Sequence, residues 1–169
     1  MPAPEDEVDR IVEAWIRERP DLDFAPLQVL SRVDRLSKHL EAARKRAFSR
    51  SSLQSWEFDV LAALRRAGSP YQLSPKTLLA QTLVSSGTMT NRIDRLVERG
   101  FVERLSDPAD GRGVLVRMTR QGLTHVDAAI TRLVDAEAAI LRSLSATDQA
   151  RLGVLLRKLT VGFDGTDEN

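Results

Sequence analysis

Side chains that can hydrogen-bond to nucleic acid recur on one side of the segment 86–99. The apolar residues of this segment follow the spacing of a buried helical stripe, at Met89, Ile93, Leu96 and Val97. The residues that fall on the opposite side are Thr88, Asn91, Arg95 and Arg99. Short hydroxyl and amide side chains suit base edges and phosphates, and an arginine can pair bidentately with guanine. The candidate DNA contacts are therefore Ser86, Thr88, Thr90, Asn91 and Arg95.

An arginine also stands in the turn-forming segment 106–113. Arg112 lies between two glycines, on a loop that can project into a DNA minor groove. Arginine is favoured there because narrow A·T-rich grooves have an enhanced negative potential. Asp107 and Asp110 are close enough in sequence to brace this guanidinium. The alternative is an ordinary hairpin tip whose surface ion pair contributes little to stability.

Two helices joined by a tight turn must position the first set of residues. A serine followed by proline predicts the start of a short helix over about 75–82. A turn over 83–85 leads to a second helix over about 86–99, after which Gly100 takes the C′ position. An earlier helix, capped by Ser55, is expected over about 56–67.

A β-hairpin is expected directly after these helices. Residues 101–105 are rich in β-formers, and apolar residues alternate over 114–118, with a long polar tip between them. Three short helices followed by a hairpin form the winged helix-turn-helix pattern, whose second paired helix enters the DNA major groove. The alternative is an all-α domain with an amphipathic surface helix, and the adjacent hairpin argues against it.

Long amphipathic helices flank this region. They are expected over 5–18 and about 26–47 on one side, and over about 119–143 and 145–162 on the other. The apolar stripes of the last two helices need a partner surface. The chain is thus predicted to be mainly α with a small β-hairpin wing, organised as N-terminal helices (1–50), a DNA-binding region (51–119), C-terminal dimerisation helices (120–162) and a flexible tail (163–169).

Composition excludes several classes of protein. The 169 residues include no cysteine, which rules out disulfides and thiolate metal sites, and only two histidines. No apolar run approaches the roughly 20 residues that cross a bilayer. The acidic N-terminal segment lacks the apolar core of a signal peptide. We therefore expect a cytoplasmic protein that does not contact membranes.

The net charge of +1 conceals an uneven distribution. Residues 1–34 carry nine acidic and four basic side chains, and residues 35–66 carry three acidic and eight basic ones. The pattern indicates either a basic surface in the middle of the chain or ordinary solvated helix faces. Charge alone does not choose between them.

The residues do not favour an enzyme. We find no Ser/His/Asp arrangement, no Gly-rich phosphate loop and no metal-ligand spacing, so we expect no catalytic residue, metal or cofactor. A winged-helix module that binds protein is a further alternative. Exposed polar residues such as Asn91, Arg95 and Arg112 favour DNA over an apolar protein groove.

The segment from Ser85 to Gly122, SSGTMTNRIDRLVERGFVERLSDPADGRGVLVRMTRQG, resembles the recognition helix and wing of the MarR family of bacterial transcriptional regulators. The likeness extends over about residues 27–160. It implies a homodimer joined by its N- and C-terminal helices. A two-fold dimer places its recognition helices about 34–36 Å apart, so the implied operator is a palindrome. Repression of a neighbouring gene is what the family leads us to expect.

The N-terminal segment VEAWIRERPDLD, from Val12 to Asp23, resembles the extra helix of the urate-responsive subgroup of that family. The resemblance implies an effector site at four matching positions, which are Trp15, Asp59, Arg66 and Arg92. Urate is a planar anion, for which an indole offers a stacking face and arginines offer hydrogen-bonding forks. Arg92 borders the buried stripe of the recognition helix, so its movement toward a ligand would reorient the DNA-reading face.

Each of these residues also has an ordinary structural interpretation. Trp15 can anchor the first helix, and Arg92 can contact a phosphate. Asp59 and Arg66 can form surface ion pairs, and Arg65 can take the place of Arg66. Other small organic anions, such as tricarboxylates and phenolic acids, also suit a basic aromatic site.

Overall fold

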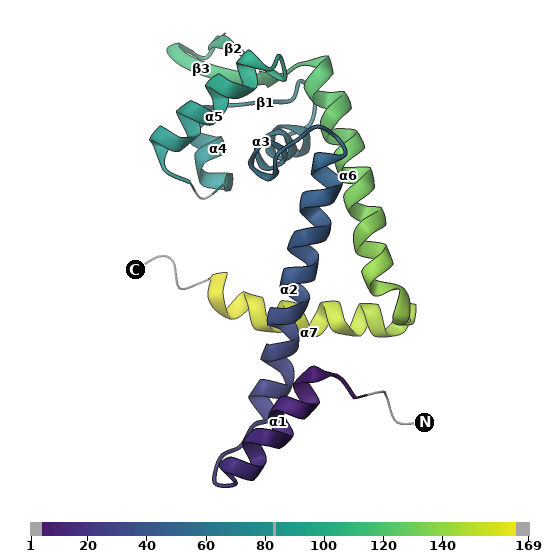
Figure 1. Cartoon of the computed structure of the whole chain (residues 1–169). Coiled ribbons are helices and arrows are strands. Elements are labelled where there is room, and N and C mark those ends of the chain that lie inside the picture. The colour runs from purple at the N-terminus through teal and green to yellow at the C-terminus, as the bar shows by residue number, and fades with distance from the viewer. Residues whose placement is uncertain (1–4, 83, 165–169) are drawn as a thin grey trace. The chain divides into compact units, whose positions relative to one another are not determined.

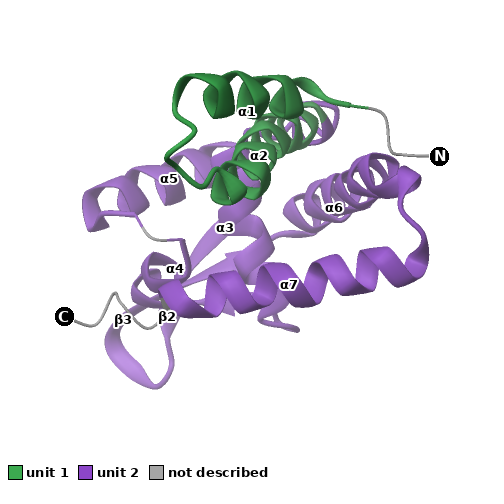
Figure 2. Ribbon diagram, turned by 90° about the horizontal axis from the view of Figure 1, so that it is seen from below, with its two compact units in different colours: residues 1–46 green, residues 47–169 purple. Residues whose placement is uncertain are grey.

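The computed structural model describes residues 5–82 and 84–164 (Figure 1). The chain divides into two compact units, residues 1–46 and residues 47–169, which are coloured separately in Figure 2. Within the described residues no helix is long and apolar enough to cross a membrane.

The first unit consists of α1 (Glu7–Glu18) and most of α2 (Ala25–Ser49). Asp6 caps α1, because its carboxylate accepts hydrogen bonds from the backbone N–H groups of Val8 and Asp9. Arg32 of α2 donates to both Asp6 and Asp9, which ties the start of α1 to α2. The predicted pair of N-terminal helices is therefore confirmed, with α2 two residues longer at its C-terminus than expected.

The second unit is centred on α3 (Ser55–Arg66), which is buried along most of its length. It packs against α4 (Pro75–Thr82), and α4 packs against α5 (Ser86–Glu98). Ser74 caps α4, as expected, and Ser85, which was predicted only as part of the turn, caps α5. The prediction for α3 was wrong in detail, because the N-cap is Gln54 and the helix begins at Ser55. Leu83, which belongs to the turn predicted over 83–85, lies outside the described residues.

A three-stranded antiparallel sheet follows, in the order β1-β3-β2. Strands β2 (Val102–Asp107) and β3 (Asp110–Met118) form the predicted wing. The prediction of a long polar tip was wrong, because both strands extend into this segment and leave only Pro108 and Ala109 between them. Strand β1 (Gln72–Leu73) was not predicted, since two residues carry no alternation to detect.

Two helices complete the chain, α6 (Arg120–Ile140) and, after a short 3-10 turn, α7 (Ala146–Asp164). Thr119 caps α6 by accepting from Gly122 N–H. The predicted single apolar stripe of α6 divides in two: Val126 and Leu133 are buried, whereas Val134 is 57% exposed. Helix α7 extends two residues beyond the expected end, and the rest of the predicted flexible tail lies outside the described residues.

Candidate nucleic-acid interface

The N-terminus of α5 is fixed by local hydrogen bonds. Ser85 Oγ accepts from the backbone N–H of Thr88 at 3.3 Å and lies 2.8 Å from Thr88 Oγ1. Thr90 Oγ1 donates to the carbonyl of Ser86 at 3.1 Å. The first turn of α5 is therefore capped and ordered before any ligand arrives.

Helix α5 separates into a buried and an exposed face, as the spacing predicts. Met89, Ile93 and Leu96 are buried in the core of the second unit. Val97 was wrongly placed in this stripe, because it is 37% exposed. All five predicted DNA contacts of the helix are exposed, namely Ser86, Thr88, Thr90, Asn91 and Arg95. Of these residues, Thr88, Asn91 and Arg95 line one face of the helix, with the cationic residue toward its C-terminal half.

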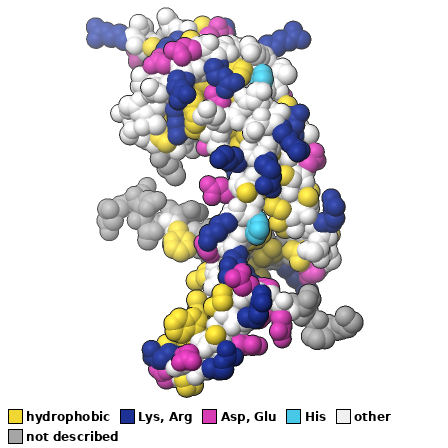
Figure 3. Space-filling view, in the orientation of Figure 1, with side chains coloured by type: hydrophobic (Ala, Val, Ile, Leu, Met, Phe, Trp, Pro, Cys, Tyr) yellow, Lys and Arg dark blue, Asp and Glu magenta, His cyan; other side chains and the backbone are white. Residues whose placement is uncertain are grey.

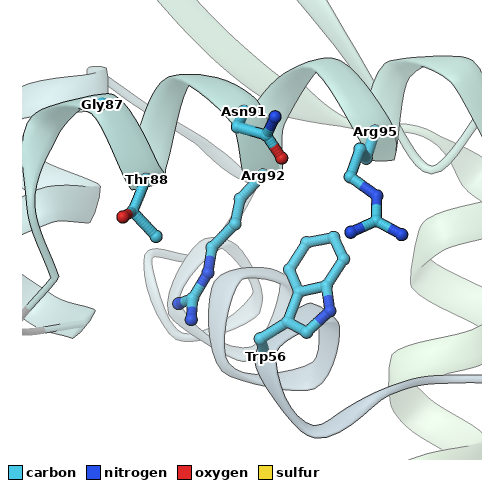
Figure 4. Close-up of a pocket in the computed structure, with 6 residues that line it drawn as sticks. All are labelled: Trp56, Gly87, Thr88, Asn91, Arg92 and Arg95. Carbon is cyan, nitrogen blue, oxygen red and sulfur yellow. The ribbon is translucent and has the colours of Figure 1, made fainter.

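An open pocket of about 410 Å³ lies along this exposed face. Its lining combines one aromatic side chain of α3 with residues of α5: Trp56, Gly87, Thr88, Asn91, Arg92 and Arg95 (Figure 4). The pocket can therefore offer hydroxyl, amide and guanidinium groups over an apolar ring. Sequence reasoning missed Trp56, although a tryptophan off the inner face marked by Phe58 and Leu61 was a signal that it served another surface.

Arg99 has a role that differs from the one predicted. It was placed on the exposed polar side of the recognition helix, but its guanidinium pairs with Glu57, which is only 1% exposed. Arg99 Nη1 donates to both carboxylate oxygens, and Nη2 donates to the carbonyl of Ser52. Arg99 is thus occupied in joining α5 to α3, because a buried carboxylate requires a charged partner.

The wing carries Arg112 on β3, not on a loop as expected, and this residue is exposed. The two aspartates beside it do not brace its guanidinium: Asp110 accepts from the backbone N–H of Arg112, and Asp107 from that of Ala109. Within the described residues no carboxylate pairs with Arg112, so its charge is available to a ligand. Figure 3 shows a Lys or Arg side chain projecting at the hairpin end of the molecule.

The wing is also joined to the recognition helix by an ion pair. Arg104 of β2 lies 2.6 Å from the carboxylate of Asp94 on α5. Both side chains are partly exposed, so the pair contributes orientation more than stability. This ion pair therefore links the wing to the recognition helix.

The four predicted effector residues lie in different parts of the chain. Trp15 belongs to the first unit, where its ring stacks on Phe24 with centroids 6.2 Å apart, and it is 49% exposed. Asp59 and Arg66 are exposed on α3. Arg92 lies on α5 over the ring of Trp56.

Arg65, the alternative to Arg66, is already occupied. Its Nε donates to Asp127 of α6 at 2.8 Å, and its guanidinium lies 5.1 Å from the centroid of Tyr71. The hydrogen bond to Asp127 raises the pKa of Arg65 above its ordinary value. Asp59 and Arg66, by contrast, form no ion pair within the part of the chain that the structure describes, so Arg66 is the freer of the two neighbouring arginines.

Similarity to known proteins was found at the level of sequence. The MarR family profile matches residues 51–113, which include the helix-turn-helix and most of the wing. The chain is 35% identical over 153 residues to the HTH-type transcriptional regulator PecS of Dickeya dadantii. That alignment covers 90% of this chain and 92% of PecS.

Solved structures show the same fold. A mutant of E. coli MarR complexed with operator DNA matches with a TM-score of 0.65 and 27% identity, covering 92% of this chain and 99% of that one. BpsR of Bordetella bronchiseptica, whose DNA binding is regulated by 6-hydroxynicotinic acid, matches with a TM-score of 0.62 and 27% identity, covering 78% of this chain and 92% of that one. The predicted winged helix-turn-helix is confirmed, and the chain belongs to the MarR family of transcriptional regulators.

Proposed function

We propose that this protein is a repressor that binds a palindromic operator as a homodimer and is released by a small anionic ligand such as urate. The observation that carries the DNA-binding part is the exposed polar face of α5, capped at Ser85 and standing beside a wing with an exposed Arg112. The DNA contacts we assign are Ser86, Thr88, Thr90, Asn91, Arg95 and Arg112. A MarR relative of the same fold has been solved on operator DNA, which supports this assignment.

Dimerisation is proposed through the N- and C-terminal helices. In α2, the large apolar residues Leu27, Val29, Leu30, Val33 and Leu36 are exposed, and in α7 so are Val154, Leu155, Leu156 and Leu159. Apolar surface of this extent is rarely left uncovered in a soluble protein, so a second copy is the natural partner. We therefore retain residues 1–50 and 120–162 as dimerisation segments and 51–119 as the DNA-binding region.

The effector site is proposed at Trp15, Asp59, Arg66 and Arg92. The exposure of Trp15 and the unpaired state of Arg66 within the described residues leave an aromatic face and a guanidinium fork available. Regulation of BpsR by 6-hydroxynicotinic acid supports a planar aromatic anion as the ligand class. Tricarboxylates and phenolic acids are the alternative effectors.

Arg92 connects the effector to the DNA. It belongs to the recognition helix, between the proposed contacts Asn91 and Arg95. A ligand that binds the DNA-free arrangement more tightly lowers DNA affinity by its differential affinity for the two states. Recruitment of Arg92 by an anion provides that difference.

A gel-shift titration on the promoter beside the protein's own gene tests the proposal. Urate is added stepwise, with a neutral purine as the control. We expect DNA to be bound by the protein alone and released by urate but not by the neutral purine. Tight binding that ignores urate would remove the ligand from the proposal and keep the regulator. Failure to bind any upstream DNA would favour a protein-interaction module instead.

A further inference from the structure

Trp56, in the first turn of α3, lies against two arginines of the recognition helix. The Cζ atoms of Arg92 and Arg95 are 5.6 Å and 5.4 Å from the centroid of its ring. Figure 4 shows the indole between the two guanidinium groups. The ring itself is held, because indole Nε1 donates to Gln54 Oε1 at 2.6 Å and the side chain packs against the core.

We propose that Trp56 is a positioning residue for DNA recognition, which orders Arg95 for contact with the operator, holds Arg92 beside it, and so contributes to sequence specificity. The proposal rests on the proposed function, and it adds to it a residue outside the recognition helix and wing. Trp56 acts through the two arginines.

The chemical nature of the partner decides whether an arginine stays available to bind DNA. Three other arginines of this region are held by carboxylates: Arg99 by Glu57, Arg104 by Asp94 and Arg117 by Glu103. A carboxylate neutralises the charge of an arginine and occupies its N–H donors. An aromatic face attracts a guanidinium by cation–π interaction and leaves both its charge and its in-plane donors free.

An arginine that contacts an aromatic ring, and not a carboxylate, keeps the donors that DNA recognition requires. Neither Arg92 nor Arg95 has a side-chain hydrogen bond or an ion pair within the described residues, so the ring of Trp56 is the contact that restricts them there. A long arginine side chain loses rotamer freedom when it pairs with a base, and an arginine that is already ordered loses less. A bidentate contact to guanine also needs the planar fork in a fixed orientation. Trp56 therefore favours correct pairing over loose attraction to phosphate.

Two substitutions at Trp56 distinguish the contact of its ring with the arginines from the packing of its side chain against the core. Trp56→Leu keeps an apolar side chain against the core and removes the aromatic face, whereas Trp56→Phe keeps a smaller aromatic face. The probe is a palindromic DNA fragment that the wild-type protein selects from random sequences, compared with copies in which each half-site guanine is replaced. We expect Trp56→Leu to bind the selected fragment about tenfold more weakly, as loss of two exposed cation–π contacts implies. The Trp56→Leu variant should also discriminate less well between the selected fragment and the copies with replaced guanines. Trp56→Phe should retain most of the wild-type affinity and most of the wild-type discrimination.

Tyr71→Asn is the matched control, because it removes the ring beneath Arg65, an arginine of α3 that is bonded to Asp127. Asparagine also tolerates the positive φ of 59° at that position. This variant should bind and discriminate like the wild type. Thermal unfolding of every variant checks that each is folded at the assay temperature.

A second readout reports on the arginines without DNA. The ring current of Trp56 should shift the Nε–H proton signals of Arg92 and Arg95, and Trp56→Leu should remove that shift. Unshifted arginine signals in the wild type, or equal affinity and discrimination in a folded Trp56→Leu variant, would overturn the proposal. If the wild-type protein selects no DNA fragment at all, the proposed DNA-binding function is wrong. That outcome differs from one in which the wild-type protein selects DNA but Trp56 has no effect on its binding.

Discussion

Both carboxylate oxygens of Glu57 accept hydrogen bonds from Nη1 of Arg99, at 2.6 and 2.5 Å. Glu57 lies in the first turn of α3, and Arg99 is the C-cap of α5. The same carboxylate also accepts from the backbone N–H of Gln54 at 2.8 Å, which completes the N-terminus of α3. One buried side chain therefore fixes both the start of the scaffold helix and the end of the recognition helix.

Arg99→Gln should destabilise the protein, because it leaves the buried carboxylate of Glu57 without a charged partner. We expect a loss of about 2–3 kcal/mol in the free energy of unfolding, below the range for fully buried pairs because Arg99 reaches solvent. Urea denaturation measures this loss. The control is Arg104→Gln, which breaks the exposed ion pair with Asp94 and should cost about 1 kcal/mol or less. Equal effects of the two substitutions would show that burial of Glu57 does not matter.

Arg95→Ala and Arg112→Ala should each weaken operator binding if α5 and the wing read DNA. Loss of a bidentate guanine contact costs about 1–3 kcal/mol, so Arg95→Ala should bind roughly tenfold or more weakly and relax specificity at one position. Arg112→Ala should lower affinity and flatten the dependence on salt. Fluorescence anisotropy at several salt concentrations measures both effects.

Arg117→Ala is the control on the same strand. Arg117 is paired with Glu103 at 2.8 Å, and residues at odd and even positions of β3 point to opposite faces. This substitution should change operator affinity little. Undiminished binding by the double variant Arg95→Ala/Arg112→Ala would mean that the reading surface lies elsewhere.

The parts of the fold that were predictable from sequence carry local signals. Ser74 and Ser85 are serine caps followed by helical spacing, and Thr119 accepts from Gly122 N–H as its position suggested. Each of these signals depends on residues within one turn of the helix. The exposed face of α5 was predictable for the same reason, because the spacing of its apolar and polar residues follows the helical repeat alone.

The parts that were missed depend on partners distant in sequence. Arg99 looks like a surface arginine until α3 brings Glu57 to it, 42 residues away. Strand β1 exists because β3 supplies a pairing edge for Gln72 and Leu73. Likewise, the importance of Trp56 becomes visible only when α5 places Arg92 and Arg95 against its ring.

Gly122→Ala should destabilise the contact between α6 and the start of the sheet. A Cβ at this position would lie 2.2 Å from the carbonyl oxygen of Phe101 and 3.0 Å from Cγ of Met118, so the helix must shift. We expect a loss of about 1–3 kcal/mol, measured by urea denaturation. Gly153→Ala in α7, where a Cβ meets nothing within 4 Å, should instead stabilise by about 0.5–1 kcal/mol. A neutral Gly122→Ala would contradict the close approach.

Arg66→Met should reduce the response to the anionic effector without weakening DNA binding in its absence. Arg66 is exposed on α3 and unpaired within the described residues, so its fork is available for an anion. Arg65→Met is the control at the adjacent position, since Arg65 is held by Asp127. The effector concentration that releases half of the DNA should rise for Arg66→Met and stay near the wild-type value for Arg65→Met. The opposite result would assign the ligand to Arg65.

The attachment of α1 to α2 should weaken in acid. The hydrogen bond from Arg32 holds the pKa of Asp6 below its ordinary value of 3.8. A carboxyl whose pKa is lowered by folding stabilises the native state fully above its unfolded pKa, and this contribution is lost as pH falls through the folded pKa. The loosening is therefore expected below pH 3.8, where protonation of Asp6 weakens its cap on α1 and removes its ion pair with Arg32.

Trp15 on α1 reports this change. The chain has two tryptophans, so Trp56→Phe leaves Trp15 as the single fluorophore. Its emission should shift toward that of a solvated indole between pH 5 and pH values below 3.8, before the far-ultraviolet circular dichroism of the whole chain is lost. In the same background, Arg32→Gln should bring the shifted emission to neutral pH, because the cation that holds Asp6 is gone. Emission that follows global unfolding in both variants would mean that this ion pair does not hold α1 in place.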